Sequence, residues 1–227
     1  INVPILLQKI EKINSFDKIY FYILIIRRYC DRIILIILCI QEFYMGNLEH
    51  NIDHILLSED DIKGIVDRLA AQITKDYENK QLLMVGILKG SMVFMADLMR
   101  KVRINTKIDF MSVSSYGSGT ASSGEVRIIM DLKSPVETYD VLLVEDILDS
   151  GATLHYLKQL LLQRNPKSIR IATLFDKPER RKADIRADYI GAVVPDEFIV
   201  GYGLDFAEDY RNLPYIGVLK PEAYKSI

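Results

Sequence analysis

From about residue 50 onward, hydrophobic positions alternate between short apolar runs and segments with helical spacing. Apolar runs bounded by turn residues predict buried strands, whereas apolar residues three and four positions apart predict amphipathic helices. The expected helices are 59–78, 91–102 and 153–164, and the expected strands are 82–88, 108–116, 126–132, 140–145, 168–175, 188–194 and 197–201. Strands that alternate with helices predict an α/β fold with a mainly parallel sheet flanked by helices and a smaller appended lobe.

The strand expected at 140–145 runs into an acidic, glycine-containing stretch, VLLVEDILDSGATL at 141–154. In parallel sheets, ligands bind outside the carboxyl ends of the strands. The small residues at 149–153 let backbone N–H groups converge at the start of the next helix, which predicts a phosphate site. Glu145 and Asp146 would repel a phosphate directly, so we expect them to face a metal ion, sugar hydroxyls or a developing cation. On residue types alone, a solvated acidic loop is the alternative interpretation.

Other phosphate motifs are absent from the sequence. No GxxxxGK[ST] pattern occurs, which excludes a P-loop. The Gly-x-Gly pairs at 117–119 and 201–203 lack a third glycine at dinucleotide-binding spacing, so they predict loops. The loop around GSGTASSG at 117–124 is either a linker or a flexible lid over a site.

Residues 1–44 differ from the rest, because they contain no glycine or alanine and include the run IYFYILIIRRYCDRIILIILCI at 19–40. A membrane helix is one interpretation, but three arginines and an aspartate at 27–32 interrupt the run, each at a cost of about 2.5–3.5 kcal/mol. A secretory signal is disfavoured, since no small-residue cleavage site follows. We favour a third interpretation, in which 1–44 are an atypical hydrophobic extension upstream of a native start at Met45, and 45–227 form the functional domain.

Charge and cysteine content narrow the setting. The formal net charge of −2 gives no electrostatic reason to expect a nucleic-acid partner. The chain has only two cysteines, so no disulfide framework is expected. These features favour a cytoplasmic protein, and we expect no membrane association.

The stretch VLLVEDILDSGATL resembles the ribose-5-phosphate-binding motif of the type I phosphoribosyltransferase family. The span from about 50 to 220 resembles the bacterial hypoxanthine-guanine branch of that family. Further matches are LKGS at 88–91, SSYGSG at 114–119, DKP at 176–178 and PDEFIVGYGLDFAEDYRNLP at 195–214. The resemblance implies the family's α/β fold with a small hood lobe and a flexible loop.

The resemblance also implies a purine salvage reaction. In the family, 5-phosphoribosyl passes from 5-phosphoribosyl-1-pyrophosphate (PRPP) to hypoxanthine or guanine, and IMP or GMP and pyrophosphate are released. The reaction depends on Mg²⁺ and passes through an oxocarbenium-like transition state. Family members form homodimers or homotetramers.

The same resemblance implies roles for individual residues. Glu145 and Asp146 face the ribose hydroxyls and Mg²⁺, Asp205 is a second metal contact, and Asp149 is the general base near purine N7. The 5-phosphate is expected at Ser150, Gly151, Ala152 and Thr153, although many relatives carry a longer or basic residue in place of Ala152. Pyrophosphate is expected at Lys89, Gly90, Ser115, Tyr116 and Arg211, with a cis Lys89–Gly90 peptide bond.

Base recognition is expected at three positions. Lys177 donates to the purine 6-oxo group, Phe198 stacks on the base, and the backbone of Ile199 meets its edge. Two alternatives stay open: a regulator that keeps the fold and binds PRPP or a nucleotide without turnover, and a transferase for another base such as xanthine.

Overall fold

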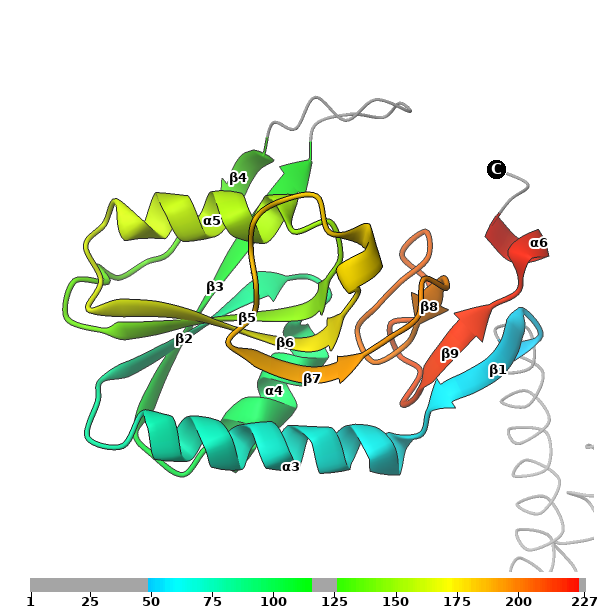
Figure 1. Cartoon of the computed structure of the whole chain (residues 1–227), viewed down its shortest axis with the longest axis horizontal. Coiled ribbons are helices and arrows are strands. Elements are labelled where there is room, and N and C mark those ends of the chain that lie inside the picture. Colours follow the sequence, from blue (N-terminus) through cyan, green and yellow to red (C-terminus); the bar gives the residue numbers. More distant parts are fainter. Residues whose placement is uncertain (1–48, 116–125, 225–227) are drawn as a thin grey trace, which may run out of the picture. The chain divides into compact units, whose positions relative to one another are not determined.

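The protein is described by a computed structural model that covers residues 49–115 and 126–224 (Figure 1). The chain divides into two units at Asn51 and Ile52, and all elements given below belong to the larger one, Ile52–Ile227. The extension expected at 1–44 and the loop at 117–124 lie outside the described residues.

A six-stranded sheet forms the centre of this unit, with the strand order β4-β3-β2-β5-β6-β7. Its strands pair in parallel except for β3 and β4, which are antiparallel. The mainly parallel sheet expected from the sequence is therefore confirmed. The bounds are β2 Leu82–Leu88, β3 Thr106–Ser115, β4 Val126–Met130, β5 Asp140–Leu148, β6 Ser168–Asp176 and β7 Tyr189–Val193.

Helices cover both faces of the sheet, as Figure 1 shows. Helices α3 (Glu59–Asp76) and α4 (Met92–Lys101) lie on one face and α5 (Ala152–Leu162) on the other. Strand β2 serves both cores, because Met84 packs with the α3 and α4 side whereas Leu83 and Val85 pack with the α5 side. Successive side chains of a strand point to opposite faces, which explains why an uninterrupted apolar run is needed here.

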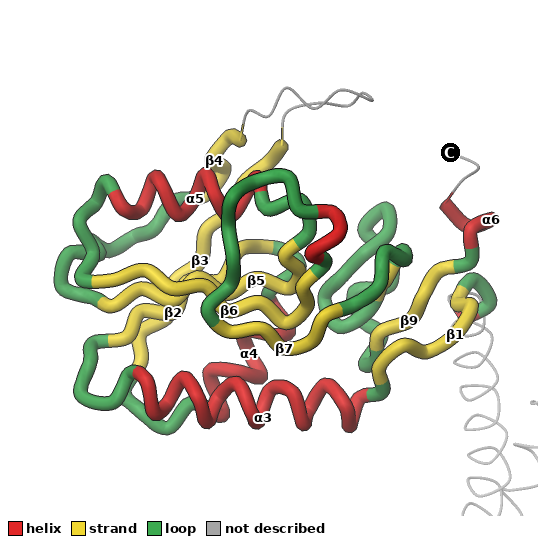
Figure 2. The backbone as a smooth tube through the Cα atoms, viewed as in Figure 1, coloured by secondary structure: helices red, strands yellow, loops and turns green. Residues whose placement is uncertain are grey.

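A smaller antiparallel sheet has the order β1-β9-β8 and corresponds to the expected small lobe. Its strands are β1 Ile52–Leu57, β8 Ile199–Val200 and β9 Ile216–Leu219, and the short helix α6 (Pro221–Tyr224) follows. Figure 2 shows that the chain between β8 and β9 is loop, and a short 3-10 helix, η1 (Pro178–Arg180), follows β6. The sequence pattern did not predict β1 or β9.

The start of α3 and the end of β5 are each set by specific contacts. Helix α3 begins with a capping box, in which the Ser58 hydroxyl accepts from the Asp61 N–H at 3.2 Å and the Asp61 carboxylate accepts from the Ser58 N–H at 3.0 Å. Strand β5, however, extends to Leu148 instead of ending at 145, because it stays paired with β6 as far as Leu148 and Asp176. Glu145 and Asp146 thus lie inside the strand.

Candidate active site

Three neighbouring parallel strands deliver the expected site residues to one edge of the sheet. Lys89 follows β2, Asp149 follows β5 and Lys177 follows β6. Since β2, β5 and β6 are adjacent in the strand order, their carboxyl ends lie side by side. The fold therefore gathers residues that are far apart in the sequence.

Glu145 and Asp146 form an acidic pair in which Asp146 is buried and Glu145 is half-buried. Burial, together with the neighbouring Asp146 carboxylate, raises the pKa of Glu145 well above its usual value. Burial likewise raises the pKa of Asp146, against the opposing effects of hydrogen bonds from Glu145 and from the Ile147 N–H. Atom Oε2 of Glu145 is enclosed and has no hydrogen-bond partner among the described residues. Such a pair is arranged for a ligand that brings positive charge or hydroxyl donors.

The carboxylates of Glu145 and Asp146 could hold a magnesium ion together with waters and substrate phosphates. Within residues 49–115 and 126–224, no group of three or more His, Cys, Asp or Glu side chains is arranged to hold a metal. Mg²⁺ is commonly bound by one or two carboxylates together with waters and substrate phosphates, so a two-carboxylate site suffices. The unsatisfied oxygen of Glu145 supports that fit, whereas Asp205 pairs with Arg211 at 2.8 Å.

Gly151 shapes the turn expected to hold a phosphate. Its φ of +80° lies in the left-handed region, and a Cβ built there would come within 2.6 Å of the Ile185 side chain. Gly151 is the N-cap of α5 and has no side chain to cap it, while the Ser150 hydroxyl accepts from the Ala152 N–H at 3.5 Å. The first N–H groups of α5, from Ala152 and Thr153 onward, begin at this turn and give it the positive end of the helix dipole. The turn can therefore bind a phosphate through backbone donors.

The side chain of Arg181 holds this turn in place through hydrogen bonds to its carbonyl groups. Its guanidinium donates to the carbonyls of Leu148 and Asp149, each at 2.9 Å, and pairs with the carboxylate of Asp176. The N–H groups of Lys182 and Ala183 donate to the carbonyl of Ser150 at 2.9 and 3.0 Å. Because these donors occupy the carbonyl groups of the turn, its backbone N–H groups are the groups available to bind a ligand.

Gly90 joins the Lys89 turn to the acidic pair. A Cβ at Gly90 would lie 1.7 Å from Asp146 Oδ2, so only glycine allows the carboxylate to approach this backbone. On the other side, a Cβ at Gly203 would lie 2.1 Å from the Gly90 carbonyl. The cis bond here lies between Leu88 and Lys89, so the expectation of a cis Lys89–Gly90 bond is wrong by one residue. A cis bond between non-proline residues leaves no signal in the sequence that would locate it.

Lys89 and Arg211, the two cationic residues expected at pyrophosphate, lie at one end of the site with two acids. Arg211 pairs with Asp205 at 2.8 Å and donates to the Gly203 carbonyl at 2.8 Å. Glu208 lies between the cations, 2.7 Å from Lys89 and 3.4 Å from Arg211. The structure thus brings Lys89, Asp205 and Arg211 together as expected.

Asp149 and Lys177 follow β5 and β6, where the sequence resemblance leads us to expect the purine base. Lys177 is almost fully buried, and its ammonium donates to the Glu197 carbonyl at 2.5 Å. Burial lowers the pKa of Lys177, opposed by the nearby charge of Asp149. Oxygen Oδ1 of Asp149 is enclosed, accepts no hydrogen bond within the described part of the chain, and lies 3.5 Å from Arg180 Nε. A proton acceptor and a buried donor therefore face the same region.

Phe198 belongs to an aromatic group at the edge of this region. Its ring stacks on Tyr224 of α6 with centroids 4.9 Å apart, and Phe206 meets it edge to face at 5.4 Å. Ile199 is buried in β8 and belongs to the core, so only its backbone is available to a ligand. Ser115 ends β3, and Tyr116 lies outside the described residues.

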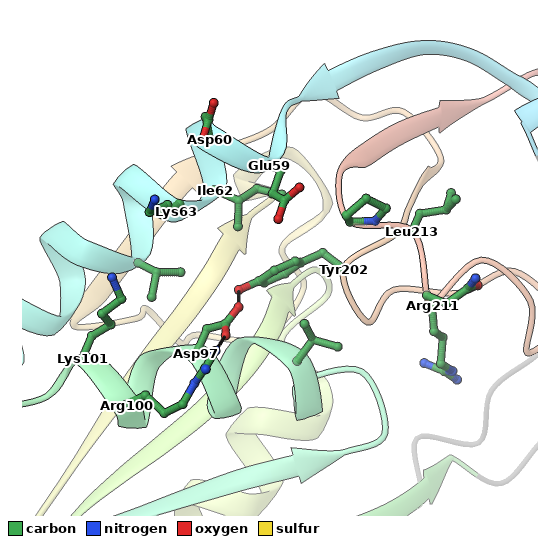
Figure 3. Close-up of a pocket in the computed structure, with 14 residues that line it drawn as sticks. Glu59, Asp60, Ile62, Lys63, Asp97, Arg100, Lys101, Tyr202, Arg211 and Leu213 are labelled. Atoms are coloured by element: carbon green, nitrogen blue, oxygen red, sulfur yellow. Dashed lines mark hydrogen bonds and ion pairs between the residues drawn. The ribbon is translucent and has the colours of Figure 1, made fainter.

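A separate pocket of about 470 Å³ lies between α3, α4 and the chain at 211–214 (Figure 3). Tyr202 reaches into it and donates to Asp97 at 2.5 Å, and Asp97 also pairs with Arg100. Among the expected site residues only Arg211 lines it, and the Arg211 guanidinium points away from the side chains of α3 and α4 in Figure 3. This pocket is not the expected site.

Comparison with known proteins identifies the class. Residues 55–207 match the phosphoribosyl transferase domain family, and the chain belongs to that family. Within it, the chain is 55% identical over 179 residues to the hypoxanthine-guanine phosphoribosyltransferase of Staphylococcus aureus (strain N315), with 79% of this chain and 100% of the relative covered. The same enzyme of Bacillus subtilis (strain 168) is 55% identical, with 79% and 99% covered.

Solved structures agree with this assignment. A crystal structure of a hypoxanthine phosphoribosyltransferase from Staphylococcus aureus matches with a TM-score of 0.76 and 56% identity, covering 78% of this chain and 96% of that one. A hypoxanthine-guanine phosphoribosyltransferase from Bacillus anthracis matches with a TM-score of 0.72 and 47% identity, covering 74% and 99%. The family resemblance drawn from the sequence is confirmed.

Sequence reasoning missed several residues that support the site. Arg181 and Arg180 were not predicted as site residues, because their contacts with the turn at 148–150 depend on the fold. Glu208 was missed because its contact with Lys89 spans 119 positions, and Tyr224 was missed because its ring partner Phe198 is 26 positions away. No local pattern marks such contacts.

Proposed function

We propose that this protein is a purine salvage enzyme that transfers the 5-phosphoribosyl group of PRPP to hypoxanthine, and also to guanine, forming IMP or GMP and pyrophosphate. The observation that carries the proposal is the convergence of an acidic pair, a phosphate-binding turn and a buried lysine at the ends of β5, α5 and β6. The relatives named hypoxanthine-guanine phosphoribosyltransferase, at 55% identity, support the choice of base.

Different residues of the chain bind the phosphate, the ribose and the pyrophosphate of PRPP. The α5 turn, from Ser150 to Thr153, binds the 5-phosphate through backbone N–H groups. Glu145 and Asp146 accept from the ribose hydroxyls and stabilise the positive charge that develops on the sugar as its bond to pyrophosphate breaks. Lys89, Gly90 and Arg211 bind the departing pyrophosphate, for which the planar fork of arginine is well suited.

The base is held by the other half of the site. Lys177 donates to the purine 6-oxo group, which selects hypoxanthine and guanine over adenine. Phe198 stacks on the ring, and the backbone at Ile199 meets its edge. Asp149 accepts the proton from N7, a role worth about 10²–10⁴ in rate. Its enclosed oxygen without a hydrogen-bond partner is consistent with that role.

Glu145 and Asp146 are the proposed first ligands of Mg²⁺, and Asp205 is a further one. When bound, the ion neutralises charge on the pyrophosphate as it leaves. Asp205 must release Arg211 to serve as a ligand, since the two are paired at 2.8 Å. Ser115 and Tyr116 are proposed to contact pyrophosphate from the loop at 114–124.

The wider setting is also a proposal. We place the enzyme in the cytoplasm as a homodimer or homotetramer, with PRPP, purine bases, nucleotides and pyrophosphate as ligands, and with neither nucleic acid nor membrane as partner. None of the helices in the described part of the chain combines the length and apolar character that a membrane crossing requires. The proposed phosphoribosyltransferase domain spans 45–227, and intact-mass measurement of the protein from its native cells shows whether 1–44 are present.

A substrate panel tests the proposal. Purified protein is mixed with PRPP and Mg²⁺, and hypoxanthine, guanine, xanthine or adenine is added separately while nucleoside monophosphate is followed. We expect product with hypoxanthine and guanine, none with adenine, and none when Mg²⁺ is removed by a chelator. Tight binding of PRPP without turnover of any base would instead indicate a regulator, and turnover of xanthine alone would indicate a different base specificity.

A further inference from the structure

The carboxylate of Glu208 bridges the two cations proposed to bind pyrophosphate. Its Oε2 lies 2.7 Å from Lys89 Nζ, and its Oε1 lies 3.4 Å from Arg211 Nη2. Lys89 and Glu208 are 119 positions apart in the sequence, so the fold and not chain proximity creates this bridge. Each oxygen of one carboxylate thus faces one cation, as two oxygens of a diphosphate would.

We propose that Glu208 takes the place of the diphosphate group on Lys89 and Arg211 when no ligand is bound, and so sets the affinity of the site for diphosphate-bearing ligands. This inference rests on the proposed function, because it takes Lys89 and Arg211 as the pyrophosphate-binding cations. The ligand class is PRPP and inorganic pyrophosphate.

The loop that carries Glu208 holds it at this position. Ala207 and Glu208 have φ of +52° and +71°, values that non-glycine residues adopt only where the surrounding structure imposes them. The Glu208 N–H donates to Asp205 Oδ2 at 3.0 Å, and Arg211 donates to the Gly203 carbonyl at 2.8 Å. The backbone is therefore fixed at both ends of the loop, and the carboxylate is presented to the cations.

The bridge is weak enough for a ligand to displace it. The side chains of Lys89 and Glu208 are 66% and 64% exposed, and exposed ion pairs contribute little to stability because water screens them. A diphosphate carries more negative charge than one carboxylate and offers several oxygens to the same donors. Ligand entry then exchanges one set of ion pairs for another, and the displaced carboxylate, still close by, repels the bound pyrophosphate and favours its release.

Binding of inorganic pyrophosphate to the full chain, in the presence of Mg²⁺, tests this inference by titration calorimetry. The variants are Glu208→Gln, which removes the charge but keeps the shape, and Asp209→Asn, which removes a neighbouring exposed charge in the same loop. We expect Glu208→Gln to tighten pyrophosphate binding by up to about 5-fold, the most that an exposed ion pair contributes, and Asp209→Asn to leave it unchanged. The KM for PRPP should fall by a similar factor, and the KM for hypoxanthine should not change.

The outcomes separate the inference from the function beneath it. Unchanged or weaker pyrophosphate binding in Glu208→Gln, with an unchanged melting temperature, would overturn the role of Glu208 and leave the enzyme assignment standing. An equal gain in Asp209→Asn would also overturn it, because the effect would then be one of general loop charge. A wild-type protein that binds neither pyrophosphate nor PRPP would overturn both.

Discussion

At the scale of single residues, the site contains acidic groups whose burial destabilises the folded state. Glu145 and Asp146 are neighbouring acids whose pKa values are both raised, and one oxygen of Glu145 has no partner within the described residues. Burying charge in this way costs stability unless a ligand neutralises it. The arrangement is therefore explained by its ligand and not by folding.

Glu145→Gln should stabilise the metal-free protein and reduce its activity. The raised pKa of Glu145 means that the folded state holds its proton to higher pH than the unfolded state does. The cost of the pair is absent below about pH 4.5, the ordinary value for Glu, and grows as pH rises through the folded-state pKa. At neutral pH we expect the melting temperature of Glu145→Gln to rise by about 2–4 °C, equivalent to 1 kcal/mol in a domain of this size.

Differential scanning fluorimetry at several pH values measures this shift. The exposed acid Glu137 provides a matched control, since Glu137→Gln should change neither stability nor turnover. A melting temperature of Glu145→Gln at or below that of wild type at neutral pH would show that the acidic pair does not destabilise the folded state.

Lys177→Met should weaken binding of the base and leave PRPP binding nearly unchanged. A hydrogen bond from a charged group contributes about 1.5–3 kcal/mol, which corresponds to roughly a 10- to 150-fold rise in the KM for hypoxanthine. Steady-state kinetics with each substrate varied in turn measure the effect, and the exposed Lys182→Met is the control. An unchanged base preference would refute the assignment of Lys177.

The sequence predicted the acids, the glycine turn and the lysine of the site, but not the residues that hold them. Glu145, Asp149 and Gly151 stand close together in one motif, so their shared location follows from local spacing. Arg181 holds the same turn from more than 30 residues away, and its role depends on how β6 and the chain after it pass under α5. Local patterns carry no information about such contacts.

At the scale of elements, two turns meet because both carry glycine. Gly90, after β2, lies against Asp146 on one side and against Gly203 on the other, with no room for a Cβ at either contact. The acidic pair, the Lys89 turn and the loop of Arg211 are consequently held as one unit.

Gly90→Ala should therefore damage catalysis more than folding. Its Cβ would lie 1.7 Å from Asp146 Oδ2, so either the carboxylate or the turn must move. We expect kcat/KM for PRPP to fall by at least about 10-fold, as expected when a positioning contact shifts by 1 Å. Gly64→Ala in α3 is the control, because its Cβ would meet nothing within 4 Å and the change should slightly stabilise the helix.

Helix α6 should contribute to base binding through Tyr224. The Tyr224 ring stacks on Phe198 with an interplanar angle of 26° and helps to fix its orientation. Loss of an aromatic pair costs about 0.5–1.5 kcal/mol, so Tyr224→Leu should raise the KM for hypoxanthine roughly 2- to 12-fold. Tyr156→Leu on α5, which is partly exposed, is the control in the same assay.

The elements themselves were predicted unevenly. Long periodic segments such as α3, and the apolar runs of β2, β5 and β6, appear where the pattern placed them. β1 and β9 were missed, and they acquire strand geometry by pairing with each other across more than 150 residues. Length alone does not explain this, since β1 is longer than β4 and β7, which were predicted. β8 has only two residues and depends on β9 in the same way.

At the scale of the whole molecule, the sheet order explains the site. β2, β5 and β6 are neighbours although β3, β4 and two helices separate them along the chain. Their carboxyl ends bring the proposed pyrophosphate, ribose and base groups together in that order. The small sheet adds Phe198 and Ile199 from β8 and its flank, which completes the base side.

The most direct test of catalysis at this site is the turnover number for IMP formation in wild type and in Asp149→Asn, with PRPP affinity measured in parallel. The asparagine keeps the shape of the side chain but cannot accept the N7 proton. We expect kcat to fall about 10²- to 10⁴-fold while PRPP affinity changes little. Equal turnover in the two proteins would contradict the assignment of the general base and of the reaction centre at the end of β5.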